Sequence, residues 1–310
     1  MTETPADRGV TKRYLLLFSI ALIWGSQFLL NHLALEVFTP QAISWLRAAI
    51  GCFTLSLFIP FVKESRPASG EKFVYWRQIV LVGFFEATLP FFLVAWGQQH
   101  VNSAVASILM SLVAVFTLVL VVIFVREEPI TAGKILGILI GFGGVLVLLW
   151  PQLDVSIAGS SLLGSAAILA AALSFAISLI LIRRLPQVDA PLRTARNILF
   201  CGAIELGLLL LFMAQPLAHH ALESGPVAAM AFQGVLAGGL VYVLYVSLVA
   251  MAGAAFAGFA NYLIPVVGVF LGVVFLHDHV SSNAYASLVI LALAIVISEW
   301  KPRRLSGGRA

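Results

Sequence analysis

The chain has 310 residues, of which 61% are hydrophobic and 10% charged, and its formal net charge is +4. Charged residues make up about a quarter of an ordinary soluble domain, so this composition excludes a soluble globular protein. The basic residues stand in small groups beside apolar runs instead of gathering on one face, which argues against nucleic-acid binding. Both cysteines, Cys52 and Cys201, lie inside apolar runs, so neither a disulfide framework nor a metal cluster is indicated.

A helix needs about 20 apolar residues to cross about 30 Å of hydrocarbon, and this length divides the chain into ten predicted spans. They cover approximately residues 14–34, 41–62, 77–97, 102–125, 132–150, 159–182, 194–214, 226–250, 255–276 and 284–300. The first is longer than a signal-peptide core, so we expect it to be retained. No Asp, Glu, Lys or Arg interrupts the chain between Glu223 and Asp278, which is too long for one helix, and we expect one turn near residues 251–254.

The distribution of basic residues predicts how the spans are oriented. Of the 18 Lys and Arg residues, only Arg47 lies well inside a span, and the others lie at or next to the termini and alternate loops. The opposite loops carry acidic residues and histidines but no Lys or Arg. The positive-inside rule therefore places both termini in the cytoplasm, as an even number of spans also requires.

The two halves of the chain resemble each other at a shift of about 150 residues. The matching pairs are Phe124–Glu127 with Phe275–Asp278, Arg47 with Arg196, Cys52 with Cys201, and Trp24 with Phe175. Because each half holds five spans, the second half must enter the membrane upside down. The sequence thus predicts an all-α integral membrane protein of two inverted five-helix repeats, an arrangement typical of secondary transporters. We expect one transmembrane domain over 1–310, with repeats at 14–150 and 159–300.

Four motifs carry a family resemblance that spans nearly the whole chain: Ala21–Phe28, Trp45–Ala48, Phe124–Thr131 and Tyr262–Val267. In their order they resemble the drug/metabolite transporter superfamily, specifically its ten-helix EamA-type members, and most of all the bacterial amino-acid exporters of the YddG kind. The resemblance implies a bacterial inner-membrane location and a central cavity surrounded by spans one, three, four, six, eight and nine, with spans five and ten outside.

The chain departs from the family pattern in its second half. His277 and Asp278 stand where a Gly-Glu pair is usual, and no proline stands at Ala114, the counterpart of Pro265. These departures bear on the substrate more than on the fold.

Two carboxylates lie near the middle of predicted spans, Glu86 in the third and Glu205 in the seventh. An ionised carboxylate there costs at least about 2.5 kcal/mol, so each needs a partner, a water-filled cavity or a proton. In one interpretation, a carboxylate contacts a substrate ammonium group or carries a coupling proton. In the other, it is a fixed counter-ion for Arg47, which lies at a compatible depth. Arg47 is in turn a candidate anchor for a substrate carboxylate, although its position in a family motif favours a structural role.

Pro90 and Pro265 interrupt predicted spans. A proline leaves the carbonyl four residues earlier without its helical donor, which here means the carbonyls of Glu86 and Asn261. Such a break is tolerated at membrane depth where it lines a cavity or is covered by neighbouring protein. The prolines therefore point to the transport pathway, with plain helix kinks as the alternative.

We predict two groups of functional residues. The predicted substrate-binding residues are Trp24, Gln27, Glu86, Ser111, Ser178, Tyr242, Asn261 and Tyr262. The predicted structural or gating residues are Arg47, Pro90, Glu205 and Pro265. For the serines, the alternative role is a bond to their own helix backbone or helix packing, and for aromatic residues near span ends it is anchoring at the interface.

The resemblance implies a secondary transporter that exports aromatic and other neutral amino acids by alternating access. We expect no cofactor, no nucleic-acid partner and no ATPase subunit, since no phosphate-binding G-x-x-x-x-G-K-[ST] motif is present, and we expect a monomer to be sufficient. One alternative is a proton-coupled exporter of cationic drugs. Others are a channel, or a membrane enzyme using loop histidines such as His219 and His277, although these lack the spacing of a metal motif.

Overall fold

The protein is a bundle of helices. Its computed structural model describes residues 5–61, 69–124, 132–150, 159–186, 189–214, 216–245, 247–248, 251 and 260–299. Within these residues there are helices and no strand, apart from one isolated bridge between Phe38 and Ala218. The elements are α1 (Pro5–Leu35), α2 (Pro40–Phe58), η1 (Ile59–Phe61), α3 (Ser69–Gly83), η2 (Phe84–Thr88), α4 (Leu89–Gly97), α5 (Ser103–Met110), α6 (Leu112–Phe124), α7 (Ala132–Leu149), α8 (Gly159–Arg183), α9 (Pro191–Met213), α10 (Ser224–Phe232), η4 (Gln233–Leu240), α12 (Ala260–Phe275) and α13 (Ser282–Glu299).

The helices fall on the ten predicted spans. Judged by length and composition, six helical stretches are long and apolar enough to cross a membrane, namely 11–35, 40–61, 73–97, 161–182, 191–213 and 224–245. Shorter apolar stretches occupy the other four spans, at 103–117, 135–144, 263–275 and 282–294. The chain is therefore an all-α, multi-pass membrane protein. The turn expected near residues 251–254 lies largely outside the described residues.

Local sequence explains where several helices begin. Thr39 caps α2 by accepting a hydrogen bond from the N–H of Ala42, and Pro40 occupies the first helical position, where its missing N–H costs nothing. Asn102 caps α5 in the same way, accepting from the N–H of Val105. These caps set the ends of two spans that carry central residues.

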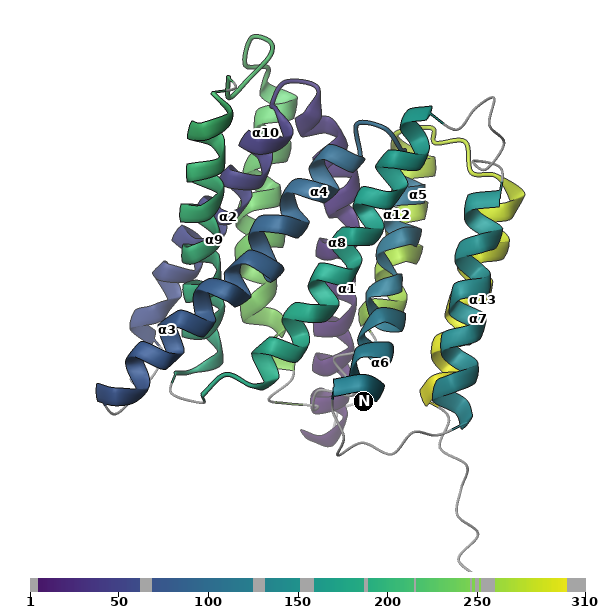
Figure 1. Cartoon of the computed structure of the whole chain (residues 1–310), viewed down its shortest axis with the longest axis horizontal. Coiled ribbons are helices and arrows are strands. Elements are labelled where there is room, and N and C mark those ends of the chain that lie inside the picture. Colours follow the sequence, from purple (N-terminus) through teal and green to yellow (C-terminus); the bar gives the residue numbers. More distant parts are fainter. Residues whose placement is uncertain are drawn as a thin grey trace, which may run out of the picture.

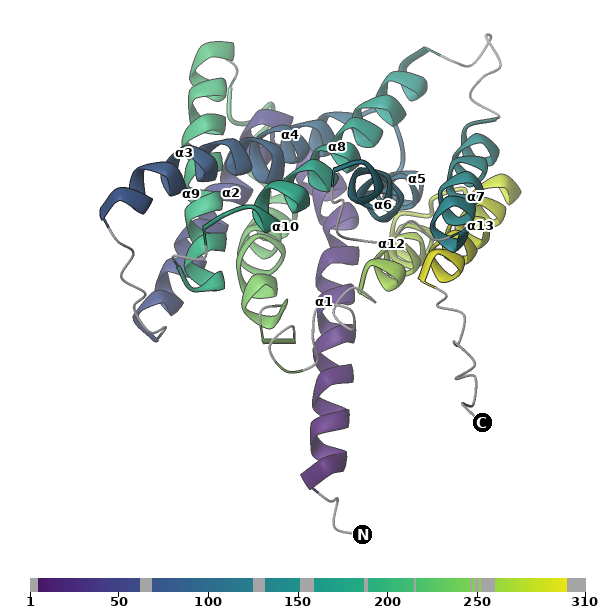
Figure 2. The same ribbon diagram turned by 60° about the horizontal axis from the view of Figure 1, so that its bottom comes forward.

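The contacts between helices follow an inverted repeat (Figures 1 and 2). We take the first repeat as α1 to α7 and the second as α8 to α13, so that α1 corresponds to α8, α2 to α9, η2 to η4, α6 to α12 and α7 to α13. Under this correspondence, α1 packs on α12 as α8 packs on α6, and α2 packs on η4 as α9 packs on η2. Helices α2 with α9 and α7 with α13 pack on their own counterparts, and the last pair lies at one edge of the bundle in both views.

Two π-helical segments interrupt the third and eighth spans. The segment η2 begins at Phe84 and η4 begins at Gln233, and the difference of 149 residues is the shift at which Arg47 pairs with Arg196. A π segment widens the helix and displaces the side chains that follow it, and such segments are frequent at functional sites. The repeat therefore extends to a local irregularity that the sequence pattern did not predict.

Helix α1 begins, and α13 ends, at one face of the bundle, which we call the N-face (the lower face in Figure 1), and the opposite face is the far face. At the far face the repeats are joined by the bridge between Phe38 and Ala218. There Asp278 also accepts a hydrogen bond from the N–H of Ala104 at 3.1 Å, in the first turn of α5. Asp278, which departs from the usual family residue, thus caps a helix of the other repeat.

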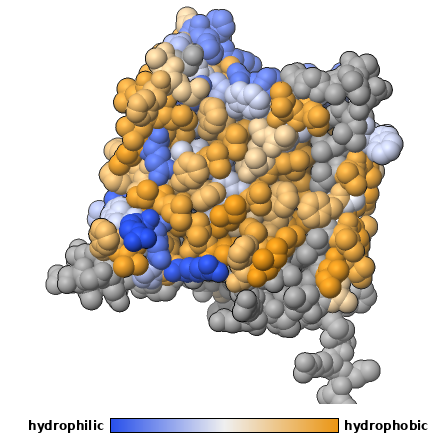
Figure 3. All heavy atoms as spheres, in the orientation of Figure 1, coloured by the Kyte–Doolittle hydropathy of each residue, from blue (hydrophilic) through white to orange (hydrophobic). Residues whose placement is uncertain are grey.

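The surface of the bundle is apolar over its middle. Figure 3 shows hydrophobic residues across the visible face, with hydrophilic residues gathered toward its ends. Large apolar side chains such as Phe53, Leu139, Leu163 and Phe212 are exposed. Exposed apolar surface of this extent is expected of a protein whose solvent around the middle is hydrocarbon.

Glycines let α2 and η4 approach closely. A Cβ atom on Gly51 would lie 2.5 Å from the carbonyl oxygen of Gly238, and one on Gly238 would lie 2.8 Å from that of Arg47. Backbone oxygens cannot move aside as a flexible side chain can. Small residues at this crossing therefore set the distance between the repeats.

We predict that Gly51→Ala destabilises the protein by about 1–3 kcal/mol, because the added methyl group overpacks a contact between two backbones. Gly143→Ala is the matched control, since a Cβ there has no neighbour within 4 Å. Thermal unfolding of the two purified variants in detergent checks this. Equal melting temperatures would show that the crossing is not tightly packed.

Candidate functional site

The site is built around η2, where the helix changes register. The N–H of Leu89 donates to the carbonyl of Phe84, five residues earlier. By the same offset Pro90, which has no N–H, leaves the carbonyl of Phe85 without its helical donor. That carbonyl accepts a hydrogen bond from Ser174 of α8 at 2.7 Å. The carbonyl capped by another helix is therefore that of Phe85 and not of Glu86 as we predicted, because the offset is five residues instead of four.

Glu86 is held by residues of the other repeat. Its Oε2 accepts a hydrogen bond from the hydroxyl of Ser178 on α8. Its Oε1 lies 3.5 Å from the hydroxyl of Tyr242, which follows η4. These donors are neutral, so they orient the carboxylate without neutralising it. Glu86 thus sits at a junction of the first repeat with two helices of the second.

Arg47 is held within the first repeat. Its Nη2 donates to Oε1 of Gln27 at 2.6 Å, and its guanidinium carbon lies 4.1 Å from the centre of the Phe91 ring. Its Nε is buried and has no hydrogen-bond partner in the described part of the chain. Among the described residues, Arg47 forms no ion pair with Glu86 or Glu205, which argues against either carboxylate as its direct counter-ion.

Aromatic rings cover the site on two sides. The Trp24 ring lies 5.4 Å from that of Tyr245 and 6.2 Å from that of Tyr242, measured between centroids. Across the site, Phe91 and Phe175 lie 6.4 Å apart. These distances suit edge and tilted ring packing. The rings come from both repeats, as do the polar groups between them.

The central side chains are enclosed but not fully covered. Trp24, Gln27, Glu86 and Tyr242 lie among helices of both repeats, yet each keeps intermediate exposure. By contrast, Arg47 and Ser178 behind them are buried. This combination is expected of side chains that line a space inside the bundle.

The other predicted residues do not join this cluster. Glu205 on α9 accepts a hydrogen bond from Thr88 at 2.5 Å, so it contacts the opposite side of η2. Ser111 donates to its own helix at Ile108, where α5 and α6 meet in a local break. The carbonyl of Pro265 lies 3.5 Å from the hydroxyl of Ser107. The side chains of Asn261 and Tyr262 lie outside the described part.

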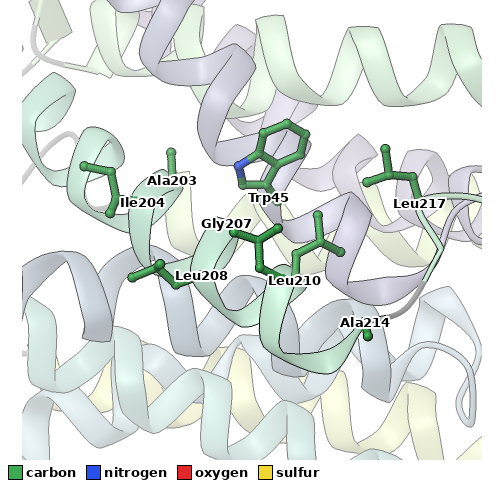
Figure 4. Close-up of a pocket in the computed structure, with 9 residues that line it drawn as sticks. Trp45, Ala203, Ile204, Gly207, Leu208, Leu210, Ala214 and Leu217 are labelled. Atoms are coloured by element: carbon green, nitrogen blue, oxygen red, sulfur yellow. The ribbon is translucent and has the colours of Figure 1, made fainter.

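An apolar pocket lies elsewhere (Figure 4). It has a volume of about 760 Å³ and is lined by Trp45 together with α9 residues such as Ile204, Gly207 and Leu208. Ile204 and Leu208 belong to the exposed apolar surface, so the pocket opens toward the membrane-facing side. Its lining has no charged side chain, and it does not include the Glu86 cluster.

Phe91 and Ser174 are among the site residues that the sequence analysis did not select, as are Phe175 and Tyr245. Phe91 is one of 22 phenylalanines, so composition could not single it out. Ser174 lies four residues before Ser178, on the same helical face, and that spacing is the signal that pairs them. In the described part of the chain, no group of three or more His, Cys, Asp or Glu could hold a metal.

We predict that Gln27→Leu destabilises the protein by about 1–3 kcal/mol, because it leaves the buried Arg47 guanidinium without its only hydrogen-bond partner among the described residues. Ser26→Ala is the control, since Ser26 bonds only to its own helix at Ile23. Thermal unfolding compares the two variants. A smaller drop in melting temperature for Gln27→Leu than for Ser26→Ala would contradict the assigned role of Gln27.

Comparison with known proteins agrees with this architecture. The EamA-like transporter family matches the chain twice, over residues 11–150 and 162–300. The uncharacterized transporter YoaV of Bacillus subtilis (strain 168) is 22% identical over 91% of this chain and 94% of its own length. An uncharacterized transporter of Archaeoglobus fulgidus is 24% identical over 92% of this chain and 99% of its own.

A solved crystal structure shows the same fold. It superposes with a TM-score of 0.63 at 17% identity, covering 93% of this chain and 96% of the other. At this identity the likeness concerns the fold alone. Because the family matches both halves and nearly the whole chain, the chain belongs to the EamA-like transporter family, in the drug/metabolite transporter superfamily.

Proposed function

We propose that this membrane transporter exports amino acids, aromatic and other neutral ones, by alternating access. The observation that carries the proposal is Glu86, an acid at membrane depth whose hydrogen-bond donors are neutral hydroxyls from the opposite repeat. A carboxylate in such a place favours a cationic partner. The ammonium group of a substrate supplies one.

The surroundings of Glu86 suit the rest of an amino acid. The buried Nε of Arg47 has no partner, so it offers a donor to a substrate carboxylate. The rings of Trp24 and Tyr245 offer an apolar wall to the side chain. Opposite charges beside an aromatic wall favour a zwitterion over an anion or a sugar.

The position of the site between the repeats supports alternating access. Ser178 and Tyr242 reach Glu86 from the second repeat, so relative motion of the repeats changes these bonds. Transporters built from inverted repeats bind substrate near the midplane and expose it to each side in turn. The position of Glu86 near the middle of its span supports this proposal.

For the orientation, we propose cytoplasmic termini in a bacterial inner membrane. The exposed Lys12 precedes the apolar part of α1 at the N-face, and Arg184 and Arg193 lie where α8 ends and α9 begins, at the same face. The positive-inside rule then makes the N-face cytoplasmic. Export corresponds to transfer from the N-face to the far face.

A proton-coupled exporter of cationic drugs is the second candidate. Glu86 next to the rings of Tyr242 and Trp24 would also suit an aromatic cation, and Arg47 would then be purely structural. The two candidate functions differ in the substrate carboxylate, which amino acids contain and cationic drugs lack.

We predict that proteoliposomes loaded with unlabelled phenylalanine transiently accumulate labelled phenylalanine, whereas those loaded with a sugar or a quaternary-ammonium drug do not. Counterflow of this kind requires a carrier and is absent from a channel. If the drug alone drives uptake of its own label, the second candidate replaces the first.

We further predict that Glu86→Gln lowers phenylalanine counterflow at least about 10-fold, because a loss of about 1.4 kcal/mol of ammonium binding is tenfold in affinity. Ser56→Ala is the control, since Ser56 is exposed and bonds to its own helix at Cys52. Unchanged counterflow and pH dependence in Glu86→Gln would remove Glu86 from both the binding and the proton-carrier roles.

A further inference from the structure

A second polar network lies in the bundle, apart from the Glu86 site. It consists of Asn31 on α1, Gln98 at the end of α4, Ser103 at the start of α5 and Gln233 at the start of η4, which we call the amide cluster. The four side chains are buried, with exposed fractions of 2%, 4%, 0% and 0%. In an apolar bundle, a buried amide is retained at a cost unless its hydrogen bonds are made.

One bond of the amide cluster crosses between the repeats, and the others join α1, α4 and α5 of the first repeat. Asn31 donates to Oε1 of Gln98 at 2.8 Å and accepts from Nε2 of Gln233 at 3.2 Å. Gln98 and Ser103 both donate to the carbonyl of Phe28, at 2.9 Å and 3.1 Å. Asn31 is therefore the central member, since it joins the first repeat to η4 of the second.

The amide cluster lies between the Glu86 site and the far face. On α1, Asn31 follows Trp24 by seven residues, which is about 10 Å at 1.5 Å per residue. On the third span, Gln98 follows Glu86 by 12 residues, and on the eighth, Gln233 precedes Tyr242 by nine, so the separations are about 18 Å and 14 Å along the helices. In all three spans the displacement from the site is toward the far face.

Among the described residues, the positions of the other repeat that correspond to the amide cluster hold no such network. At the shift of 149 residues, Gln233 corresponds to Phe84 and Gln98 to Ser247, and at the shift of 151 that pairs Trp24 with Phe175, Asn31 corresponds to Ile182. Ser247 bonds only to its own helix at Val243. Within the described part of the chain, hydrogen-bonded amides therefore lie toward the far face, whereas the matching positions hold two apolar side chains and a serine bonded to its own helix.

We propose that the amide cluster is the far-face gate of the transporter and that its hydrogen bonds favour the resting state closed at the far face. This inference rests on the proposed export from the N-face to the far face. With the far face closed at rest, the site meets substrate from the N-face first. Opening breaks the bonds of Asn31, and water entering from the far face takes their place, so the amides suit a gate that must open reversibly.

Packing alone does not account for the amide cluster. Near-isosteric apolar residues would fill the same volume without polar groups to satisfy. The Oε1 of Gln233 is buried and has no hydrogen-bond partner among the residues that the structure describes, so this arrangement leaves one acceptor unsatisfied. A contact with a remaining cost in the closed state is better explained by a second state in which it is hydrated.

The test uses pulsed electron–electron double resonance to measure the distance between two spin labels at the far face, in the full-length, substrate-free protein in liposomes. Spin labels are placed at Glu36→Cys, at the end of α1, and Gln99→Cys, at the end of α4, which are both exposed. The free native cysteines are removed by Cys52→Ser and Cys201→Ala. The label pair reports the separation, at the far face, of α1 and α4, which the bond between Asn31 and Gln98 joins.

In the native gate, we expect one dominant short distance. Asn31→Leu removes both of its side-chain hydrogen bonds and should increase the population at longer distance at least about 3-fold, the effect of one average interhelical hydrogen bond in a membrane. Gln98→Met is the second variant and should act in the same direction. Should Asn31→Leu fail to fold, Gln98→Met alone decides.

Gln41→Met is the matched control, because Gln41 is buried near the far face but contacts Met213 outside the amide cluster. It should leave the distances unchanged. If the long-distance population in both cluster variants equals that of the control, the gate assignment is overturned. The result does not depend on the substrate, so failure of the amino-acid assignment in counterflow would be distinguishable from failure of the gate.

Discussion

The structure depends on one constraint: within the membrane, each backbone polar group must find its hydrogen-bond partner inside the protein. The third span breaks the helical ladder at η2 and places Glu86 there. The side chains that donate hydrogen bonds to the freed carbonyl of Phe85 and to Glu86 are Ser174 and Ser178, and both come from α8 in the other repeat. The irregular helix therefore ties the two repeats together at the place where the substrate is proposed to bind.

Contacts between the repeats also explain how the fold can position the substrate site and still allow the repeats to move relative to each other. Backbone contact at Gly51 and Gly238 fixes the crossing of α2 with η4. The polar contacts at Glu86 and at Asn31 are ordinary hydrogen bonds, and each such bond between membrane helices is worth about 0.6 kcal/mol on average. Tight small-residue packing thus provides rigid elements, and weak polar bonds provide the points at which they separate.

Much of the fold could be predicted from sequence, because hydrocarbon thickness and the distribution of basic residues act on whole spans. The site was predicted in part: Gln27, Arg47, Glu86, Ser178 and Tyr242 lie together, whereas Ser111 and Glu205 lie apart from them. The π register of η2 had no periodic signal, since five residues cannot change an apolar pattern. The amide cluster was missed because its members meet only through tertiary packing, and Gln98 stands at a span end where an amide is ordinary.

The central claim is that Glu86 and Ser178 act together, across the repeats, to bind the substrate. A double-mutant cycle on phenylalanine binding to purified protein tests it most directly, using Glu86→Gln, Ser178→Ala and the pair. Coupling predicts that the double variant loses clearly less affinity than the product of the two single losses. Independent losses, or unchanged affinity in all three variants, would contradict the claim.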